Sequence, residues 1–382
     1  MGETTTHHVD LRRSRRIGLA ASLTVCGTML LVAVSTWALG GSRIDLVPLD
    51  IPWPVADLVS VLQFPMPRLP RFSLPRILWI VLGFAIVGLV LYALLTGSRR
   101  AVPARGAGFT VFLLGWACTA PAVGAAAIVF GVAGRVYWPD VDLWRMPGML
   151  YSAAGWGLIF GWLGGLAAAL TYSITSSPAH RAASPSTRRA SWTPAASSAV
   201  FLGLLFLVSG LLTPRDPVEV GAGYLNLITF PDPVSGSWYF SEDPPGFVVA
   251  LDLGALLFLT VAAVVTMTLL LGAAVRFVRP RGGAGGVFML GWGCTILVAG
   301  GVGVLKSLIF LVVDLASQGE FIGSFPYSAA IDGAAYGLLV GWLMGAVAMV
   351  AHLRSRPREA ASTDLRHEAE GALARRGEMS KP

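Results

Sequence analysis

Three ionisable residues inside long apolar stretches are the side chains best suited to chemistry in this sequence: Asp252, Lys306 and Asp332. A charge inside a bilayer is costly, so such a residue usually pairs with another or lines a pathway. Together, Lys306 and one of the aspartates could form a polar pocket that recognises a ligand. The first half of the chain lacks this set, because Phe130 stands at the position equivalent to Lys306 and Arg76 at that of Asp252.

The depth of these residues supports a second interpretation. Lys306 lies roughly 28 Å from Val287 along a helix that rises 1.5 Å per residue, which places it near the outer end of its span. Asp252 and Asp332 also fall near the outer ends of their spans. A lysine at this depth can extend its ammonium group to the membrane surface. The three residues could therefore be interfacial or form a structural ion pair, without binding a ligand.

The cysteines Cys118 and Cys294 are the other potentially reactive groups, each within a Gly-Trp-x-Cys-Thr sequence. No histidine or acidic residue accompanies either of them, and a thiol surrounded by apolar groups stays protonated and unreactive. Small polar side chains in membrane helices usually hydrogen-bond to their own helix or to a neighbour. We therefore interpret both cysteines as packing residues.

The remaining polar side chains do not indicate catalysis. Asp140 and Asp142 could bind a divalent cation, but two carboxylates in an exposed loop are more often simply solvated. His7 and His8 are adjacent in a polar terminus and form no recognisable site. Phosphate-binding, zinc-protease, nucleophile-elbow and kinase motifs do not occur in the sequence. We predict no catalytic residues, no metal site and no cofactor, and we do not expect an enzyme.

The sequence contains a long internal repeat. Phe112–Thr119 matches Phe288–Thr295, and Tyr151–Ala154 matches Tyr327–Ala330 at the same sequence offset. Such self-similarity indicates a duplicated structural unit. A slightly larger offset relates the next matching residues, which indicates a short insertion before Gly337.

Glycines spaced four apart follow the second of these matches in both halves. Residues at this spacing share one helix face, where the missing side chains let a neighbouring backbone approach closely. The glycines could form a moving or dimerising interface, but we favour static packing of span 148–174 against span 330–353. The two ladders consist of Gly157, Gly161 and Gly165 in the first half and Gly337, Gly341 and Gly345 in the second.

The composition indicates a membrane protein. Only 13% of the 382 residues are charged and 55% are hydrophobic, against about 25% charged residues in soluble domains. The mean hydropathy is +0.69, as expected for a chain that crosses a bilayer repeatedly. We predict an all-α integral membrane fold with eight transmembrane helices arranged as two parallel four-helix repeats. The predicted spans are 17–39, 78–96, 110–134, 148–174, 197–213, 247–277, 287–313 and 330–353.

The first span could instead belong to a signal peptide, because a basic segment precedes it. Its apolar run is longer than the roughly 7–15 residues of a signal core, so we favour a retained helix. The predicted segments are a basic terminus (1–16), a first membrane repeat (17–174), a Ser/Pro/Arg linker (175–196), a second membrane repeat (197–353) and a charged tail (354–382). A short interfacial helix is also expected at 54–64.

Most arginines lie at the two termini and in the loops after the second, fourth and sixth spans. The positive-inside bias therefore predicts that both termini are cytoplasmic. Because each repeat has an even number of spans, both repeats would have the same orientation. Lysine is rare beside arginine, alanine and glycine, a composition typical of a bacterial protein, and we expect the bacterial cytoplasmic membrane.

Two functions are consistent with this architecture. The first is a transport or permeation component, with Lys306 and the two aspartates as the recognition point. The second is a non-transporting subunit or scaffold that binds a partner protein, which the scarcity of charge deep in the spans favours. The expected partners are the lipid bilayer and another membrane chain or a cytoplasmic ATPase. No nucleic-acid partner is expected, because the basic residues follow membrane topology.

Overall fold

The structure is a computed structural model that describes residues 3–40, 74–99, 107–137, 146–175, 188–212, 246–278, 283–317 and 326–355. Within these ranges every regular element is an α-helix, and eight helices are long and apolar enough to cross a membrane. The predictions of an all-α fold and of eight candidate spans are therefore confirmed. The interfacial helix expected at 54–64 lies outside the described residues.

Each predicted span corresponds to one helix of the structure. The helices are α1 (Glu3–Gly40), α3 (Leu74–Arg99), α4 (Gly108–Tyr137), α5 (Met146–Thr175), α6 (Arg188–Leu212), α7 (Gly246–Val275), α8 (Ala284–Ser317) and α9 (Pro326–Arg354). Most of them extend beyond the apolar run that identified them. Apolar runs mark the part that needs lipid, whereas helical hydrogen bonds continue into the flanking polar residues.

Helix α1 begins much earlier than the apolar run predicted, and it includes most of the segment assigned to the basic terminus. Contacts with α5 hold this extension in place. The Nε–H of Arg13 donates to the hydroxyl of Thr175 at 3.2 Å, and its Nη2–H donates to the carbonyl of Tyr172 at 3.3 Å. The guanidinium group also lies 5.0 Å from the centre of the Tyr172 ring. Its positive charge is favourable there, because carbonyl groups without helical partners end α5.

Helix α6 begins at Arg188, so the last part of the predicted linker is helical. Trp192 accounts for this extension, because its ring packs over Gly272 of α7. A Cβ placed on Gly272 would lie 3.1 Å from the ring. Glycine leaves room for the indole to lie close to α7, and the contact fixes the first turns of α6.

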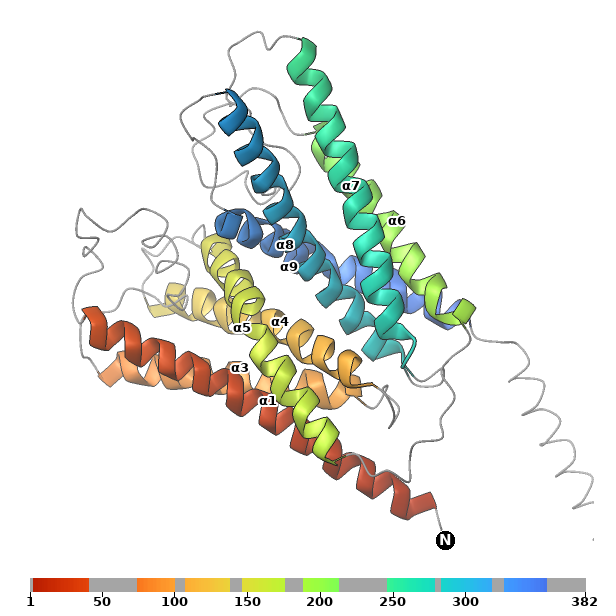
Figure 1. The fold of residues 1–382 in the computed structure, drawn as a ribbon. Coiled ribbons are helices and arrows are strands. Elements are labelled where there is room, and N and C mark those ends of the chain that lie inside the picture. The colour runs from red at the N-terminus through yellow and green to blue at the C-terminus, as the bar shows by residue number, and fades with distance from the viewer. Residues whose placement is uncertain are drawn as a thin grey trace, which may run out of the picture.

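Helices α4, α5, α8 and α9 lie between two outer helix pairs, α1 with α3 and α6 with α7 (Figure 1). Within the first four helices, α1 packs against α3 and α5, and α4 packs against α3 and α5. The last four helices make the same set of contacts, with α6, α7, α8 and α9 in the corresponding places. The two halves meet chiefly where α4 contacts α8 and where α5 contacts α9.

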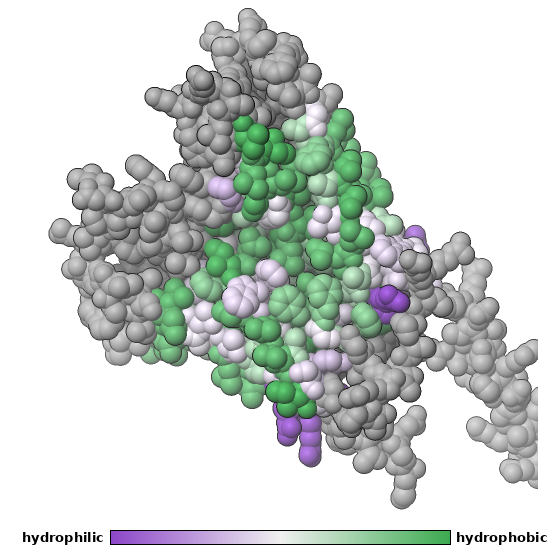
Figure 2. All heavy atoms as spheres, in the orientation of Figure 1, coloured by the Kyte–Doolittle hydropathy of each residue, from purple (hydrophilic) through white to green (hydrophobic). Residues whose placement is uncertain are grey.

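Burial separates the central helices from the outer ones. The buried share of the candidate span is 78% in α4 and 72% in α8. In α1 and in α7 it is only 33%. The outer helices expose large aliphatic side chains, and Figure 2 shows hydrophobic side chains over much of the described surface on the face drawn. Such an exposed apolar surface fits lipid contact. It includes Leu19, Leu23, Leu82, Leu89, Val200, Leu204, Val261, Val265 and Leu269.

The tryptophans of the repeated motif make closely similar contacts in both halves. The Nε1–H of Trp116 donates to the carbonyl of Gly157 at 3.1 Å, and that of Trp292 donates to the carbonyl of Leu338 at 2.9 Å. Each bond ties the third helix of a half to its fourth, α4 to α5 and α8 to α9. A buried indole N–H needs such an acceptor, since leaving it unsatisfied costs free energy.

The glycine ladders pack against the third helix of their own half, not against each other. This corrects the expectation that the ladder of α5 would meet that of α9. A Cβ on Gly165 would lie 2.5 Å from the carbonyl oxygen of Phe112, and a Cβ on Gly345 equally close to that of Phe288. Any side chain there would overlap the neighbouring backbone. In order along each ladder, the positions contacted are Ala120, Trp116 and Phe112 in α4, and Ile296, Trp292 and Phe288 in α8.

Candidate functional site

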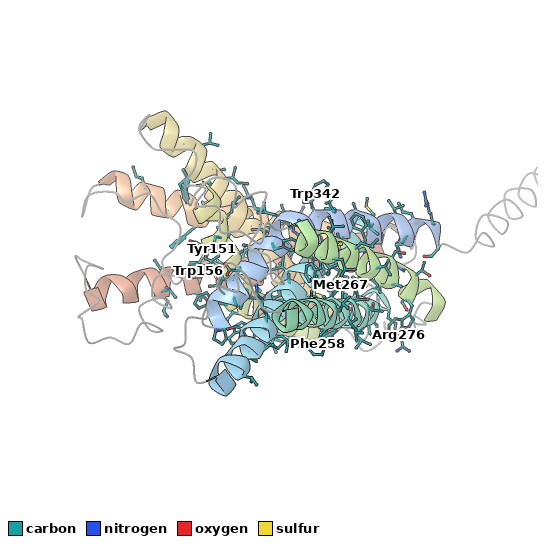
Figure 3. The ribbon with its side chains drawn as sticks, turned by 90° about the horizontal axis from the view of Figure 1, so that it is seen from above. Tyr151, Trp156, Phe258, Met267, Arg276 and Trp342 are labelled. Carbon is teal, nitrogen blue, oxygen red and sulfur yellow. The ribbon has the colours of Figure 1, made fainter. Side chains whose placement is uncertain are left out.

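Three polar side chains meet where α5 of the first half lies beside α8 and α9 of the second. The hydroxyl of Tyr151 donates a hydrogen bond to the carboxylate of Asp332, and the ammonium group of Lys306 interacts electrostatically with the same carboxylate. Figure 3 labels Tyr151 on α5 and Arg276 toward the other end of the bundle. We call Tyr151, Lys306 and Asp332 the polar cluster.

The polar cluster lies near the ends of three candidate spans, as the sequence predicted for Lys306 and Asp332. These spans are Leu150–Thr175, Ala284–Ile309 and Ala329–Arg354. All three side chains are half-buried. A carboxylate at this depth is tolerated when a hydroxyl and a cation satisfy it, because removal of an ion from water otherwise costs several kcal/mol. The cluster is therefore a satisfied polar group at the margin of an apolar bundle.

Two of the three predicted site residues are thus in one place, and one residue was missed. Asp252 lies in α7, but its side chain is outside the part of the chain that the structure describes. In the sequence, Tyr151 stands out only as part of the internal repeat. Its position at the start of a span, like that of Asp332, was the signal that could have identified it as a partner.

Small and aliphatic side chains fill the junction next to the polar cluster. They come from all four central helices and form a buried group of their own, with Leu158 and Trp292 packed against it. Since alanines predominate, the backbones of the two halves approach closely here. The group consists of Ala120, Ala154, Ile296, Ala334, Ala335 and Leu338.

Contacts across the junction are reciprocal. A Cβ on Gly124 would lie 3.5 Å from Cδ2 of Leu338, and a Cβ on Gly300 would lie 3.2 Å from Cδ2 of Leu158. Gly300 is the repeat equivalent of Gly124, and Leu338 is that of Leu158. The contact between one pair of positions therefore recurs between their equivalents, which is the pattern of an interface built around a two-fold axis.

One contact involves a position and its own equivalent. A Cβ on Gly293 would overlap the Cβ of Ala117, and these two residues correspond in the repeat. Equivalent positions can touch only where the axis that relates them passes between them. The local axis of the junction therefore runs between α4 and α8 at Ala117 and Gly293.

The polar cluster does not obey this symmetry. Phe130 stands at the position equivalent to Lys306, and the residue that matches Tyr151 is Tyr327, whose side chain lies outside the described residues. No aspartate in the first half matches Asp332. Phe130 is 1% exposed, so a buried apolar ring takes the place of the cation on that side. A carboxylate and a cation therefore occur on one side only of an otherwise repetitive interface, which sets this position apart chemically.

The cysteines of the repeated motif lie in the hydrophobic interior. Cys118 and Cys294 are free thiols and are fully or almost fully buried. The adjacent hydroxyls of Thr119 and Thr295 donate to carbonyls one turn back in their own helices, at 2.9 and 2.8 Å. Within the described ranges, no group of three His, Cys, Asp or Glu side chains could hold a metal ion. Asp140, Asp142 and the side chains of His7 and His8 lie outside those ranges.

The chain matches no family model, no curated protein and no solved structure. The junction between the halves and the polar cluster beside it are the features of the described residues that bear on function.

Proposed function

We propose that this chain is a multi-pass protein of the bacterial cytoplasmic membrane, built as two parallel four-helix repeats with both termini in the cytoplasm. The eight apolar helices and the reciprocal contacts at Gly124, Gly300 and their leucine partners support this arrangement. The distribution of arginine supports the orientation. In this orientation the polar cluster lies at the outer face of the membrane.

We further propose that the protein is a transport or permeation component, with the polar cluster as its recognition point. The observation that carries this proposal is the hydrogen bond from Tyr151 of one half to Asp332 of the other, beside Lys306. Ionisable groups at an interface inside a bilayer usually pair, and often mark a pathway. A solute that replaced the Tyr151 hydroxyl on Asp332 would release one half from the other at the outer face.

A second hydrogen bond joins the halves near the opposite end of the bundle. The hydroxyl of Thr110 in α4 donates to the carbonyl of Ala274 in α7 at 3.0 Å, and it is buried. Along the central helices, the axis contact between Ala117 and Gly293 lies between this hydrogen bond and the one from Tyr151 to Asp332. A hydrogen bond between neutral groups contributes only about 0.5–1.5 kcal/mol, and one to a charged group about 1.5–3 kcal/mol, so either link could open while the other holds. In this mechanism the halves rock about the axis contact and expose the junction to each side in turn.

Substituted cysteines test this mechanism without knowledge of the substrate. In a background without Cys26, Cys118 and Cys294, single cysteines would replace Lys306 or Leu338. We expect a membrane-impermeant thiol reagent to modify both positions in cells, because a path admits water past the polar cluster to Leu338. The modified fraction would be measured by mass spectrometry of the purified protein.

Val265→Cys is the matched control, because Val265 is 51% exposed on the apolar outer surface of α7. It should remain unmodified, since lipid excludes the reagent. Modification at Lys306 but never at Leu338, with the reagent on either side of the membrane, would contradict a path through the junction.

A partner-binding subunit is the second candidate function. The buried group of alanines beside the polar cluster favours it, because this group closes the junction with well-packed apolar side chains. Gentle affinity purification from native membranes tests it, with mass spectrometry of the co-purifying chains. A stoichiometric membrane chain or ATPase would support a subunit. A protein that purifies alone and moves solutes in liposomes would support a stand-alone transporter.

A further inference from the structure

Arginines at the start of the first candidate span lie on one exposed face of α1. Arg12, Arg15 and Arg16 are all exposed. Their spacing of three and four residues places them together on the helix surface. Three like charges in this arrangement repel one another, so an anion that contacts more than one of them would be stabilising.

The same face continues along the helix as an apolar stripe. Leu19 is 53% exposed and Leu23 is 64% exposed, and both continue the spacing of Arg12 and Arg16 at intervals of one turn. The hydrocarbon of one leaflet is roughly 15 Å thick, or about ten helical residues beyond Arg16. Leu19 and Leu23 fall within this depth. The face therefore presents positive charge at one end and a leaflet-deep apolar surface beyond it.

Arg13 fixes the direction in which this face points. Its guanidinium group is occupied by the hydroxyl of Thr175, the carbonyl of Tyr172 and the ring of Tyr172, all in α5. The side of α1 that carries Arg13 is therefore packed against α5. Figure 2 shows hydrophilic side chains at the lower edge of the molecule, where Figure 1 shows α1.

We propose that this face of α1 binds an anionic phospholipid. The phosphate of the headgroup contacts Arg12, Arg15 and Arg16, and an acyl chain lies along Leu19 and Leu23. Guanidinium groups suit this role, because their planar forks donate two parallel hydrogen bonds to phosphate oxygens. The proposal rests on the bilayer embedding proposed above, and it is independent of whether the protein transports a solute.

Native mass spectrometry of the full chain in detergent tests the lipid site. The purified protein would be titrated with phosphatidylglycerol and with phosphatidylcholine of the same acyl chains. We expect at least one phosphatidylglycerol to bind more tightly than phosphatidylcholine. Because one arginine near a lipid surface contributes about 1 kcal/mol, the double variant R12Q/R16Q should bind it about 30-fold more weakly.

The matched control is R276Q/R354Q, which removes two exposed arginines at the same end of the bundle but not on α1. We expect it to retain the wild-type affinity for phosphatidylglycerol. Equal binding of the two lipids by the wild type, or equal weakening by both double variants, would overturn the site. Displacement of the lipid by inorganic phosphate at similar concentration would overturn the acyl-chain contact.

Extraction of the membranes with alkaline carbonate separates this proposal from the embedding on which it rests. Release of the wild-type protein would overturn both. Retention in the membrane without a preference for phosphatidylglycerol would overturn the lipid site alone.

Discussion

Single glycines set the closest approaches in this protein. A Cβ on Gly303 of α8 would overlap the carbonyl oxygen of Ala329, and one on Gly333 of α9 would overlap that of Ala299. In both cases the obstacle is backbone, which cannot move aside as a flexible side chain can. Helix association in lipid depends on such close packing, because apolar side chains gain little by leaving lipid for protein. The second half therefore relies on glycine at these two positions.

Gly303→Ala should destabilise the protein by about 1–3 kcal/mol, the usual cost of overpacking. Gly301→Ala is the control from the same turn of α8, because a Cβ there meets no atom within 4 Å. It should change stability by less than about 0.5 kcal/mol. Thermal unfolding in detergent, followed by circular dichroism, would measure both. Equal effects of the two variants would show that α8 and α9 leave room for a methyl group at Gly303.

Tyr151 and Asp332 should show energetic coupling across the junction. Tyr151→Phe removes the hydroxyl that donates to the carboxylate, and hydrogen bonds to charged groups contribute about 1.5–3 kcal/mol. Asp332→Asn removes the charge but keeps the shape. A double-mutant cycle measured by thermal unfolding should give a coupling energy of at least about 0.5 kcal/mol. Strict additivity of the two substitutions would rule out this hydrogen bond as a link between the halves.

At the scale of helices, α4 and α8 form the centre of the bundle, and the outer helices cover them. The native cysteines report this difference directly. Cys118 and Cys294 lie in α4 and α8 and are almost fully buried, whereas Cys26 in α1 is half-buried and donates its thiol to the carbonyl of Phe84 at 3.4 Å. Shielding by neighbouring helices thus distinguishes thiols of the same chemistry.

N-ethylmaleimide should therefore modify Cys26 first in the folded protein, and modify all three thiols only after unfolding in SDS. Intact-mass measurement over time would count the adducts. The variant Cys26→Ala should acquire none before unfolding. Early modification of Cys118 or Cys294 in this variant would mean that α4 or α8 is open to the reagent.

Helix positions were largely predictable from the sequence, and helix contacts were not. Apolar runs located all eight helices, because hydropathy depends on each residue alone. The early start of α6 could not be anticipated, since it depends on Trp192 meeting Gly272 of another helix. The partner of each glycine ladder was also wrongly predicted, because a small-residue face specifies close contact without specifying the neighbour. The same limit explains why Lys306 and Asp332 were found while Tyr151 was not.

At the scale of the whole molecule, the two halves are alike in packing and different in chemistry. The contacts of the glycine ladders and of the junction recur at equivalent positions, whereas the carboxylate and the cation of the polar cluster occur on one side only. A repeated frame with a single polar position offers one recognition point instead of two. If the polar cluster recognises a ligand, as proposed above, we expect one ligand per chain.

Reporter fusions would test the proposed parallel orientation of the halves. Reporters after residues 180 and 382 should give cytoplasmic signals, and reporters after residues 60 and 230 should give outer signals, because arginine is concentrated at the first two positions. Alkaline phosphatase and green fluorescent protein fusions would read the two sides. A cytoplasmic signal after residue 230 would refute the parallel arrangement.

The contact between Ala117 and Gly293 has a consequence for the ancestry of the chain. Two separate copies of the first half, assembled in the same way, would place Ala117 against Ala117, where the space holds one methyl group. A homodimer must carry the same residue on both sides of its axis, whereas a fused gene can evolve alanine on one side and glycine on the other. When fragments 1–180 and 181–382 are produced together, fragment 1–180 should therefore pair with fragment 181–382 in preference to a second copy of itself.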